Sequence, residues 1–321
     1  MSRLLYLAFS GGGLQGGHKM VFRHVEALRD LGFDALVYTG KDNKIPQWFA
    51  HRAPIEVGTP VRPDDLLVIP DDATDVLARM VGSSRPAVVF GQSNPTQVIA
   101  NLAPTMDRFP PGQRPTLMVV GPMLAELYAR LYPDSRLGIV PCFADERIFR
   151  PGPDRQRAVA FTPRKRPQGG SAIRTLHDRL DTGRPALAWR ELSDATEAQV
   201  AETFGASTLH LSLSRMESVG ITALEAMASG CVCAGFTGVG GRAYATADNG
   251  FWAAEDDVEA AAEALARADD VVCTGGPSLQ HMLEAGRETA ERWSYARFRE
   301  SLEAFWMEHA PGTRLQAGPL G

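Results

Sequence analysis

The sequence is poor in cysteine, has no long apolar run and carries no marked excess of charge of one sign. Its four cysteines fit neither a disulfide ladder nor a zinc pattern, so free thiols are expected. The seven histidines show no metal-site spacing, so no metal is expected. No apolar run approaches the ~20 residues that span a bilayer. These absences argue against a disulfide-rich secreted domain, a zinc protein and an integral helical membrane protein.

The net charge and the first residues of the sequence limit which partners and which cellular location are expected. The formal net charge is −5 over 321 residues, which argues against a dedicated nucleic-acid-binding protein. The apolar run 4–9 is too short for a signal peptide, and charged residues follow it soon. A cytoplasmic protein without a transmembrane segment is therefore expected. Attachment to the inner face of the membrane is the alternative.

Short apolar runs alternate with helical stretches along the whole chain, a pattern typical of an α/β fold with mainly parallel sheets. Proline residues bracket the segment 136–156, which is predicted to be a linker between two similar halves. The predicted strands are 4–9, 35–38, 66–69, 87–90, 117–120, 158–161, 186–189, 208–211 and 232–236. The predicted helices are 17–31, 195–204, 222–228, 258–268, 279–289 and 295–309.

The first predicted strand leads into the glycine-rich stretch SGGGLQGG. Gly11-x-Gly13-x-x-Gly16 matches the dinucleotide fingerprint, which suggests an NAD-dependent oxidoreductase as one hypothesis. That fingerprint needs an acidic residue at the end of the second strand. Here Gly40 follows that strand and Asp42 comes later, so the carboxylate is displaced. The motif alone therefore does not decide the function.

The most informative stretch is SRMESVGITALEAMASGCVCAGF, residues 214–236. If a helix begins near Ile221, the first amides of that helix, Ile221 and Thr222 among them, form a site for a diphosphate. Gly220 lets the backbone approach the ligand closely. Glu217 then lies before the helix and Glu225 about one turn inside it. Two carboxylates that flank an anion site are suited to accept hydrogen bonds from sugar hydroxyl groups.

The stretch ESVGITALEAMASG, residues 217–230, resembles the E-x7-E motif of the retaining glycosyltransferases of family four, which have the GT-B fold. The resemblance covers most of the chain in the right order. GGHKMVFRHVEALRDLGFDALVYT is similar to the family's first loop, helix and second strand, and VPCFADERIFRP to its interdomain linker. FTPRKRP is similar to its diphosphate-binding basic pair, and RWSYARFRESLEAFW to its last helix, which crosses back to the first domain.

The resemblance implies two Rossmann-like domains that face each other across a cleft. It places the acceptor-side domain at 1–140 plus the helix 296–310, and the donor-binding domain at 141–295. A disordered tail is expected at 311–321.

The resemblance also implies roles for particular residues. Glu217 should contact the donor sugar, Arg164 and Lys165 should neutralise the diphosphate, and Glu225 should bind the ribose. Gly16 and Gly17 should bring backbone close to the donor. The implied activity is metal-independent transfer from a nucleoside diphosphate sugar, of UDP or GDP type, with retention of configuration and no cofactor.

Some features depart from the family pattern or leave alternatives open. The family often has Glu-Gly-Phe-Gly where this chain has Glu-Ser-Val-Gly, and a histidine where this chain has GQSN. Gln92 or Asn94 is expected to replace that histidine as a sugar or acceptor contact, with His18 as a further candidate; helix capping is the alternative for both amides. The stretch TGVGGR, residues 237–242, either touches the donor or only turns the chain.

The sequence does not identify the acceptor. A hydroxyl group of a cell-surface polysaccharide, a glycolipid or a natural product is expected. Transfer to modified DNA bases is an alternative, for which the first half offers a few arginines to contact phosphates. These are Arg23, Arg79, Arg85, Arg108 and Arg114.

Overall fold

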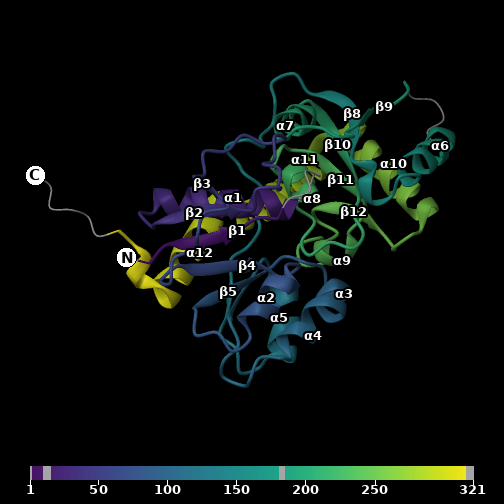
Figure 1. Ribbon diagram of the computed structural model, residues 1–321. Coiled ribbons are helices and arrows are strands. Elements are labelled where there is room, and N and C mark those ends of the chain that lie inside the picture. Colours follow the sequence, from purple (N-terminus) through teal and green to yellow (C-terminus); the bar gives the residue numbers. More distant parts are fainter. Residues whose placement is uncertain (1, 10–15, 181–184, 316–321) are drawn as a thin grey trace, which may run out of the picture. The chain divides into compact units, whose positions relative to one another are not determined.

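The computed structural model describes residues 2–9, 16–180 and 185–315, which form two compact units (Figure 1). Unit 1 comprises Met1–Pro141 and Phe298–Gly321, and unit 2 comprises Cys142–Arg297. Each unit is built on one parallel β-sheet with helices packed against it. The predicted α/β class with two Rossmann-like domains is confirmed.

Unit 1 contains seven parallel strands in the order β3-β2-β1-β4-β5-β6-β7. The order reverses between β1 and β4, and ligands of such sheets bind at the carboxyl ends of the strands at this switch point. The strands are β1 (Leu4–Leu7), β2 (Ala35–Thr39), β3 (Ile55–Val57), β4 (Leu66–Pro70), β5 (Ala87–Gly91), β6 (Thr116–Val119) and β7 (Leu137–Ile139). The helices are α1 (Gly16–Asp30), α2 (Thr74–Met80), α3 (Pro95–Gln97), the π-helix η1 (Val98–Leu102), α4 (Ala103–Met106) and α5 (Pro122–Leu131).

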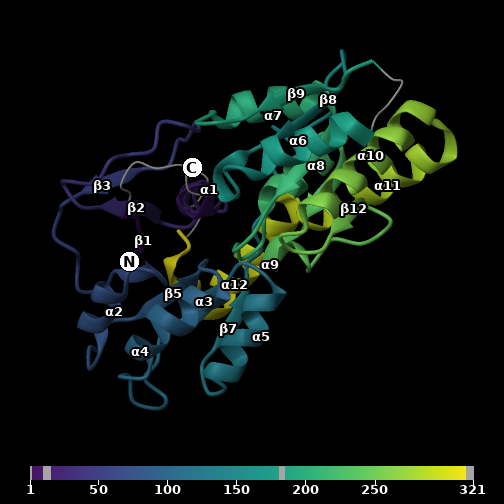
Figure 2. The same cartoon turned by 90° about the vertical axis from the view of Figure 1, so that its right-hand side faces the viewer.

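The last long helix, α12 (Tyr295–His309), begins in unit 2 and packs on the sheet of unit 1 (Figure 2). Its buried apolar side chains include Phe298, Leu302 and Trp306. At β7, a Cβ atom on Gly138 would lie 2.6 Å from the ring of Phe305, so only a glycine admits the helix this closely. The expected return of the last helix to the first domain is therefore confirmed.

A polar contact lies inside this apolar interface. The indole of Trp306 donates a hydrogen bond to the hydroxyl group of Tyr6 (3.0 Å), which lies 3.3 Å from Nδ1 of His24. The His24 ring also packs against Phe90 and Phe298. Burial lowers the pKa of His24 to about 3, because the imidazolium form cannot be solvated here.

Acid is expected to weaken unit 1 through His24. The unfolded chain binds a proton near pH 6.5 and the native state only near pH 3, so this part of the stability is complete above pH 6.5 and is lost as the pH falls. On going from pH 7.5 to 4.5, the wild type should lose about 3 kcal/mol more than His24→Gln. Hydrogen exchange in β1 and α12 measures this difference. His281→Gln, on an exposed side chain of unit 2, is the control and should follow the wild type.

The end of the chain corrects one expectation. Residues 311–315 are not a disordered tail: η3 (Pro311–Thr313) is a 3₁₀ turn, and Arg314 bridges Phe33. The amide of Asp34 donates to the carbonyl of Thr313 (3.0 Å), and the amide of Leu315 donates to the carbonyl of Gly32 (2.7 Å). The segment lacks periodicity because these contacts, and not an amphipathic pattern, hold it. Residues 316–321 lie outside the described residues.

Unit 2 contains five parallel strands in the order β12-β11-β10-β8-β9. Helix α10 packs beside β11 and β12 and against α6, whereas α8 packs with α7 and α11 (Figure 1). The strands are β8 (Gln156–Phe161), β9 (Ala188–Glu191), β10 (Ser207–Leu213), β11 (Val232–Phe236) and β12 (Gly250–Ala253). The helices are the 3₁₀ turn η2 (Pro163–Lys165), α6 (Gly169–Leu180), α7 (Glu197–Gly205), α8 (Ile221–Ala228), α9 (Gly238–Gly241), α10 (Val258–Thr274) and α11 (Gly276–Arg292).

Candidate functional site

In unit 2 the strand order reverses between β8 and β10, so their carboxyl ends form the switch point of this sheet. The basic residues Arg164 and Lys165 lie in η2, which follows β8. Glu217 lies in the loop that follows β10. Parallel pairing of β8 and β10 therefore brings together side chains that are about 50 positions apart in the sequence.

The three side chains form a loose charge cluster. Nη2 of Arg164 and Nζ of Lys165 each lie 3.9 Å from Oε1 of Glu217. The Arg164 side chain is 55% exposed and that of Lys165 is 33% exposed, whereas the Glu217 side chain is 19% exposed. At this distance and exposure the ion pairs contribute little to stability, on the order of 0–1 kcal/mol. The two cations thus remain open to a stronger anion such as a diphosphate.

Helix α8 begins beside this cluster. Gly220 precedes it in the left-handed conformation (φ 78°, ψ 57°), which favours glycine, and no side chain caps the helix at this position. A Cβ atom there would lie 3.3 Å from Oε2 of Glu217. The first amides of the helix, those of Ile221 and Thr222, have no intrahelical partner, and the helix dipole adds positive potential. This end of α8 is therefore suited to bind an anion.

Tyr244 lies close enough to Glu217 and Glu225, the two glutamates of the motif, to be affected by their charges. Its hydroxyl group donates a 2.6 Å hydrogen bond to the carbonyl of Gly220 and so holds the turn before α8. Burial raises the pKa of Tyr244 well above its ordinary value, and the nearby charges of Cys233, Glu217 and Glu225 add to the effect. Glu225 is itself buried, in the middle of α8. Tyr244 could not be predicted from the sequence, because a lone tyrosine after a glycine-rich turn has no characteristic spacing.

Arg166 does not belong to the exposed basic pair. Its side chain is buried, packs on the ring of Phe236 at 4.1 Å, and forms ion pairs with Glu255 (2.5 Å) and Asp256. Glu255 also accepts a hydrogen bond from the amide of Gly238 (2.9 Å). Arg166 thus anchors η2 to the segment that follows β12, and so positions its two exposed neighbours.

The stretch 237–242 follows β11 and has a packing role. It forms α9, whose Val239 amide donates to the carbonyl of Arg215 (2.8 Å). A Cβ atom on Gly240 would lie 2.4 Å from the backbone of Ser218 and Val219. Backbone therefore touches backbone here, and α9 supports the loop that carries Glu217. Contact with a donor is not needed to explain these glycines.

The predicted residues of unit 1 lie at its own switch point. Gly16 and Gly17 open α1, and a Cβ atom on Gly17 would lie 3.2 Å from Oε1 of Gln92. His18 is partly buried, and burial lowers its pKa while the charge of Asp72 opposes the shift. Within the described part of the chain, Nδ1 of His18 and Oε1 of Gln92 are buried and have no hydrogen-bond partner. Gly11 and Gly13 of the glycine motif lie outside the described residues.

Asn94, by contrast, serves the backbone. It is the N-cap of α3, where its side-chain oxygen accepts a hydrogen bond from the amide of Gln97 (3.1 Å) in a capping box. The capping alternative is thus the one that the structure contains for Asn94, whereas Gln92 makes no cap.

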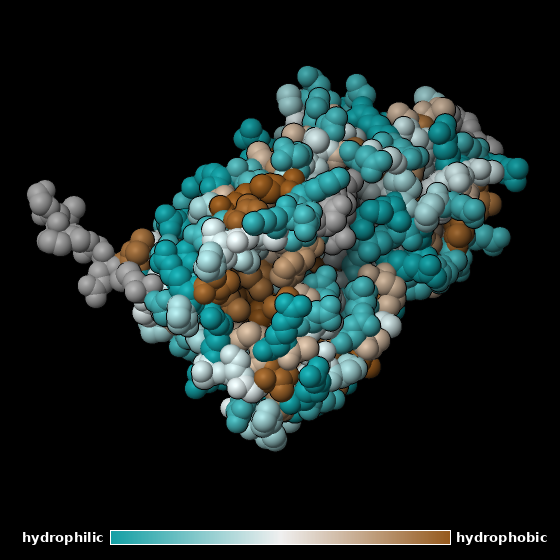
Figure 3. Space-filling view, viewed as in Figure 1, coloured by the Kyte–Doolittle hydropathy of each residue, from teal (hydrophilic) through white to brown (hydrophobic). Residues whose placement is uncertain are grey.

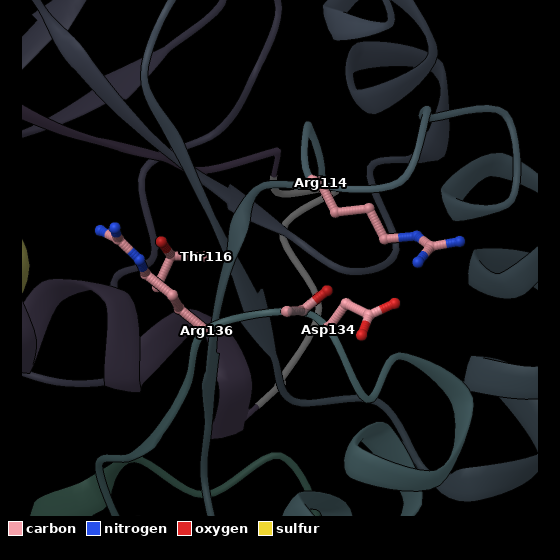
Figure 4. Close-up of a pocket in the computed structure, with 6 residues that line it drawn as sticks. Arg114, Thr116, Asp134 and Arg136 are labelled. Carbon is pink, nitrogen blue, oxygen red and sulfur yellow. The ribbon is translucent and has the colours of Figure 1, made fainter.

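Unit 1 also contains a hollow with a volume of about 230 Å³ (Figure 4). Two of its residues, Arg114 and Arg136, carry guanidinium groups that point away from each other in Figure 4. The exposed Asp134 carboxylate also lines it. The two cations do not converge on one anion, so this hollow lacks the arrangement found at α8. The remaining lining residues are Gly112, Thr116 and Ser135.

Other surfaces add no second candidate. Figure 3 shows apolar side chains on the face that it presents of unit 1; among the exposed large apolar side chains of this unit, Val57 of β3 is 44% exposed. Among the residues that the structure describes, no group of three or more His, Cys, Asp and Glu side chains is placed to hold a metal ion. No helix of the described ranges has the length and apolarity to cross a membrane.

Comparisons with known proteins match part of the sequence and the fold of the chain. Residues 193–287 match the family model described as glycosyl transferases group 1, a span that includes the E-x7-E stretch and α8. The matched part is less than a third of the chain. No curated protein sequence matches the chain significantly.

The fold itself is found in solved structures of low sequence identity. Sucrose-phosphate synthase from Thermosynechococcus elongatus is 13% identical, with 96% of this chain and 99% of that chain covered and a TM-score of 0.70. The Anabaena protein HepE, in complex with UDP and glucose, is 14% identical over 96% and 100% of the two chains, with a TM-score of 0.68. An α-glucosyltransferase in complex with UDP is 11% identical over 96% and 100%, with a TM-score of 0.63. This chain therefore has the fold of the GT-B glycosyltransferases.

Proposed function

We propose that this chain is a retaining glycosyltransferase, which moves a sugar from a nucleoside diphosphate sugar of UDP or GDP type to a hydroxyl acceptor. The observation that carries the proposal is the meeting of Arg164, Lys165 and Glu217 beside the uncapped start of α8. The group 1 model match over 193–287 and the UDP-containing structures of the same fold support it. Membership of family four remains part of the proposal.

The proposed chemistry assigns each group a task. As the bond between the sugar and the diphosphate breaks, negative charge develops on the leaving oxygen. Arg164, Lys165 and the amides of Ile221 and Thr222 stabilise this charge, so no metal ion is required for that task. The departing phosphate takes the proton of the acceptor hydroxyl group, and the acceptor attacks from the same face. Glu217 accepts hydrogen bonds from the sugar, and Glu225 from the ribose.

The acceptor side is proposed to lie at the switch point of unit 1. There His18 and Gln92 offer buried polar atoms to carbohydrate hydroxyl groups, whereas Gly16 and Gly17 bring backbone close to the donor. The acceptor is proposed to be a cell-surface polysaccharide, a glycolipid or a natural product. We place the reaction in the cytoplasm.

Thermal stabilisation by a ligand panel tests the proposal. Because a ligand that binds only the native state raises the melting temperature, UDP or GDP, or one of their sugar conjugates, should do so. Glu225→Ala should remove the shift, since it deletes the ribose contact. Glu263→Ala, on an exposed side chain of α10, is the matched control and should keep it. A shift with NAD or NADP alone would contradict the proposal and favour an oxidoreductase.

A further inference from the structure

Asp71, directly after β4, is a buried carboxylate for which the reaction proposed above has no use. It is 3% exposed and lies at the switch point of unit 1. Its Oδ2 accepts hydrogen bonds from the amides of Gln92 (3.1 Å) and Ser93 (2.9 Å) and from the hydroxyl group of Tyr128 (3.1 Å). Its Oδ1 accepts one from the Ser93 hydroxyl group (2.9 Å). The carboxylate therefore ties the loop after β5 to α5.

These bonds match the ionised form of Asp71. An ionised carboxylate only accepts, and the amides of Gln92 and Ser93 can only donate, whereas the hydroxyl groups of Ser93 and Tyr128 can donate to the ionised form or accept from the protonated one. Among the described residues, the groups with the largest effect on the Asp71 charge are its neighbour Asp72, the loop residues Gln92 and Ser93, and Tyr128 of α5, and none of these four is a cation. Burial raises the pKa of Asp71 to about 6, against the effect of the hydrogen bonds from the loop.

The loop that Asp71 holds has little freedom. A Cβ atom on Gly91 would lie 2.9 Å from the Tyr128 hydroxyl oxygen and 3.0 Å from Val119, so the backbone is seated tightly before Gln92. The Gln92 side chain then reaches Gly17, where its Oε1 is buried without a hydrogen-bond partner among the described residues. A buried acceptor of this kind costs free energy unless a donor reaches it. A carbohydrate hydroxyl group is such a donor.

We propose that Asp71 is a positioning residue: its ionised carboxylate fixes the backbone of Gln92 and Ser93 and thereby aims the Gln92 side-chain amide at a hydroxyl group of the carbohydrate substrate. For its ligand, this inference rests on the function proposed above. Asp71 itself touches no substrate. It trades stability for geometry, because a carboxyl group whose pKa is raised on folding stabilises the native state less as the pH rises through the range of 3.8 to about 6.

Asp71→Asn tests the inference, because asparagine has the shape of the protonated acid. Hydrolysis of the nucleotide sugar selected by the thermal panel should be about tenfold slower in the variant and independent of pH between 5 and 8. The wild type should fall to the same level as the pH drops through about 6. The variant should melt no lower than the wild type at pH 7.5, since it buries no charge. Asp75→Asn, an exposed change four positions further on, should keep the wild-type profile.

Adding a sugar acceptor to the assay separates the two sources of the hydroxyl group. A defect in hydrolysis without acceptor assigns it to the donor sugar, and a defect in transfer alone assigns it to the acceptor; either supports the inference. An Asp71→Asn profile that retains the wild-type rate and acid limb overturns it.

A readout without substrate separates this inference from the proposed function. The amide NMR signals of Gln92 and Ser93 should titrate near pH 6 in the wild type and not in Asp71→Asn. If they do not titrate, the positioning role fails whatever the enzyme does. If they titrate but no nucleotide sugar binds or is hydrolysed, the proposed function fails, and with it the carbohydrate ligand assigned to Gln92.

Discussion

Replacement of both Arg164 and Lys165 by alanine is expected to weaken UDP binding by roughly two to three orders of magnitude. Each side chain can donate a charge-assisted hydrogen bond to the diphosphate, worth about 1.5–3 kcal/mol in a site that excludes water. Part of this is lost to screening, because Arg164 is more than half exposed. The variant should fold normally, because the ion pairs that it loses among the described residues are the weak 3.9 Å contacts of Arg164 and Lys165 with Glu217. Titration calorimetry with UDP measures the change.

Arg174→Ala is the control for this experiment. Arg174 is a similarly exposed cation of unit 2 on α6, and its loss changes the net charge without touching the charge cluster. UDP affinity should remain within a factor of about two. Because the control removes one positive charge and the double variant two, a loss of binding free energy in the control about half that of the double variant would mean that UDP responds only to the net charge of the unit.

Glu217→Gln is expected to change UDP affinity in the opposite direction, which gives a second test of the same charge cluster. The Glu217 carboxylate is the counter-ion of both cations in the free protein, so a diphosphate must compete with it. Without that charge UDP should bind as well as before or several-fold more tightly, whereas turnover of the UDP-sugar should fall about 100-fold with the loss of a sugar contact. Weaker UDP binding in this variant would contradict the placement of the diphosphate beside Glu217.

The sequence predicted the class of the fold because short apolar runs of four to six residues become central strands. Val232–Phe236, for example, is wholly buried and occupies the predicted range. The short edge strands were missed: β3 (Ile55–Val57) and β7 (Leu137–Ile139) have three residues each, partly exposed, and β7 lies within the predicted linker. Such strands exist because a neighbouring strand offers hydrogen bonds, and this is not encoded in their own periodicity.

The candidate site was predictable only where a motif is local. Glu217, Gly220 and Glu225 lie within one loop and helix, so their spacing alone suggested an anion site. Arg164 and Lys165 followed from resemblance, since the pairing of β8 with β10 cannot be read from either strand.

The residues that position the site from outside the motif could not be predicted, for a further reason. Asp71, Tyr244 and Arg166 act through partners that are 21 or more positions away, and a single buried acid, phenol or base carries no sequence signal until those partners are known.

Substitution of Gly238 or Gly240 in α9 is expected to be strongly destabilising, because the helix backbone touches the backbone of the loop that holds Glu217. Gly238 has a positive φ of 62°, and a Cβ atom there would lie 2.8 Å from the Arg215 carbonyl oxygen. Gly240 has no unusual φ, but its Cβ atom would lie 2.4 Å from the backbone of Ser218 and Val219. Backbone cannot rotate away from such a contact as a flexible side chain can. A side chain at either glycine would therefore force α9 or the loop 215–219 to shift.

Gly240→Ala is accordingly expected to destabilise unit 2 by about 3–5 kcal/mol, at the upper end for an overpacked site, and to abolish measurable UDP binding. Gly241→Ala is the matched control in the same helix: its Cβ atom would meet the Tyr244 hydroxyl oxygen at 3.4 Å, an ordinary contact. That variant should stay within about 1 kcal/mol of the wild type and retain UDP binding, since alanine favours a helix over glycine. Thermal melting with and without UDP distinguishes the two. If unit 2 of Gly240→Ala fails to fold, hydrogen exchange should still show the native pattern in unit 1, because α9 belongs to unit 2. A Gly240→Ala protein that binds UDP like the wild type would mean that the loop from Arg215 to Val219 adapts, and that its geometry does not depend on the close approach of α9.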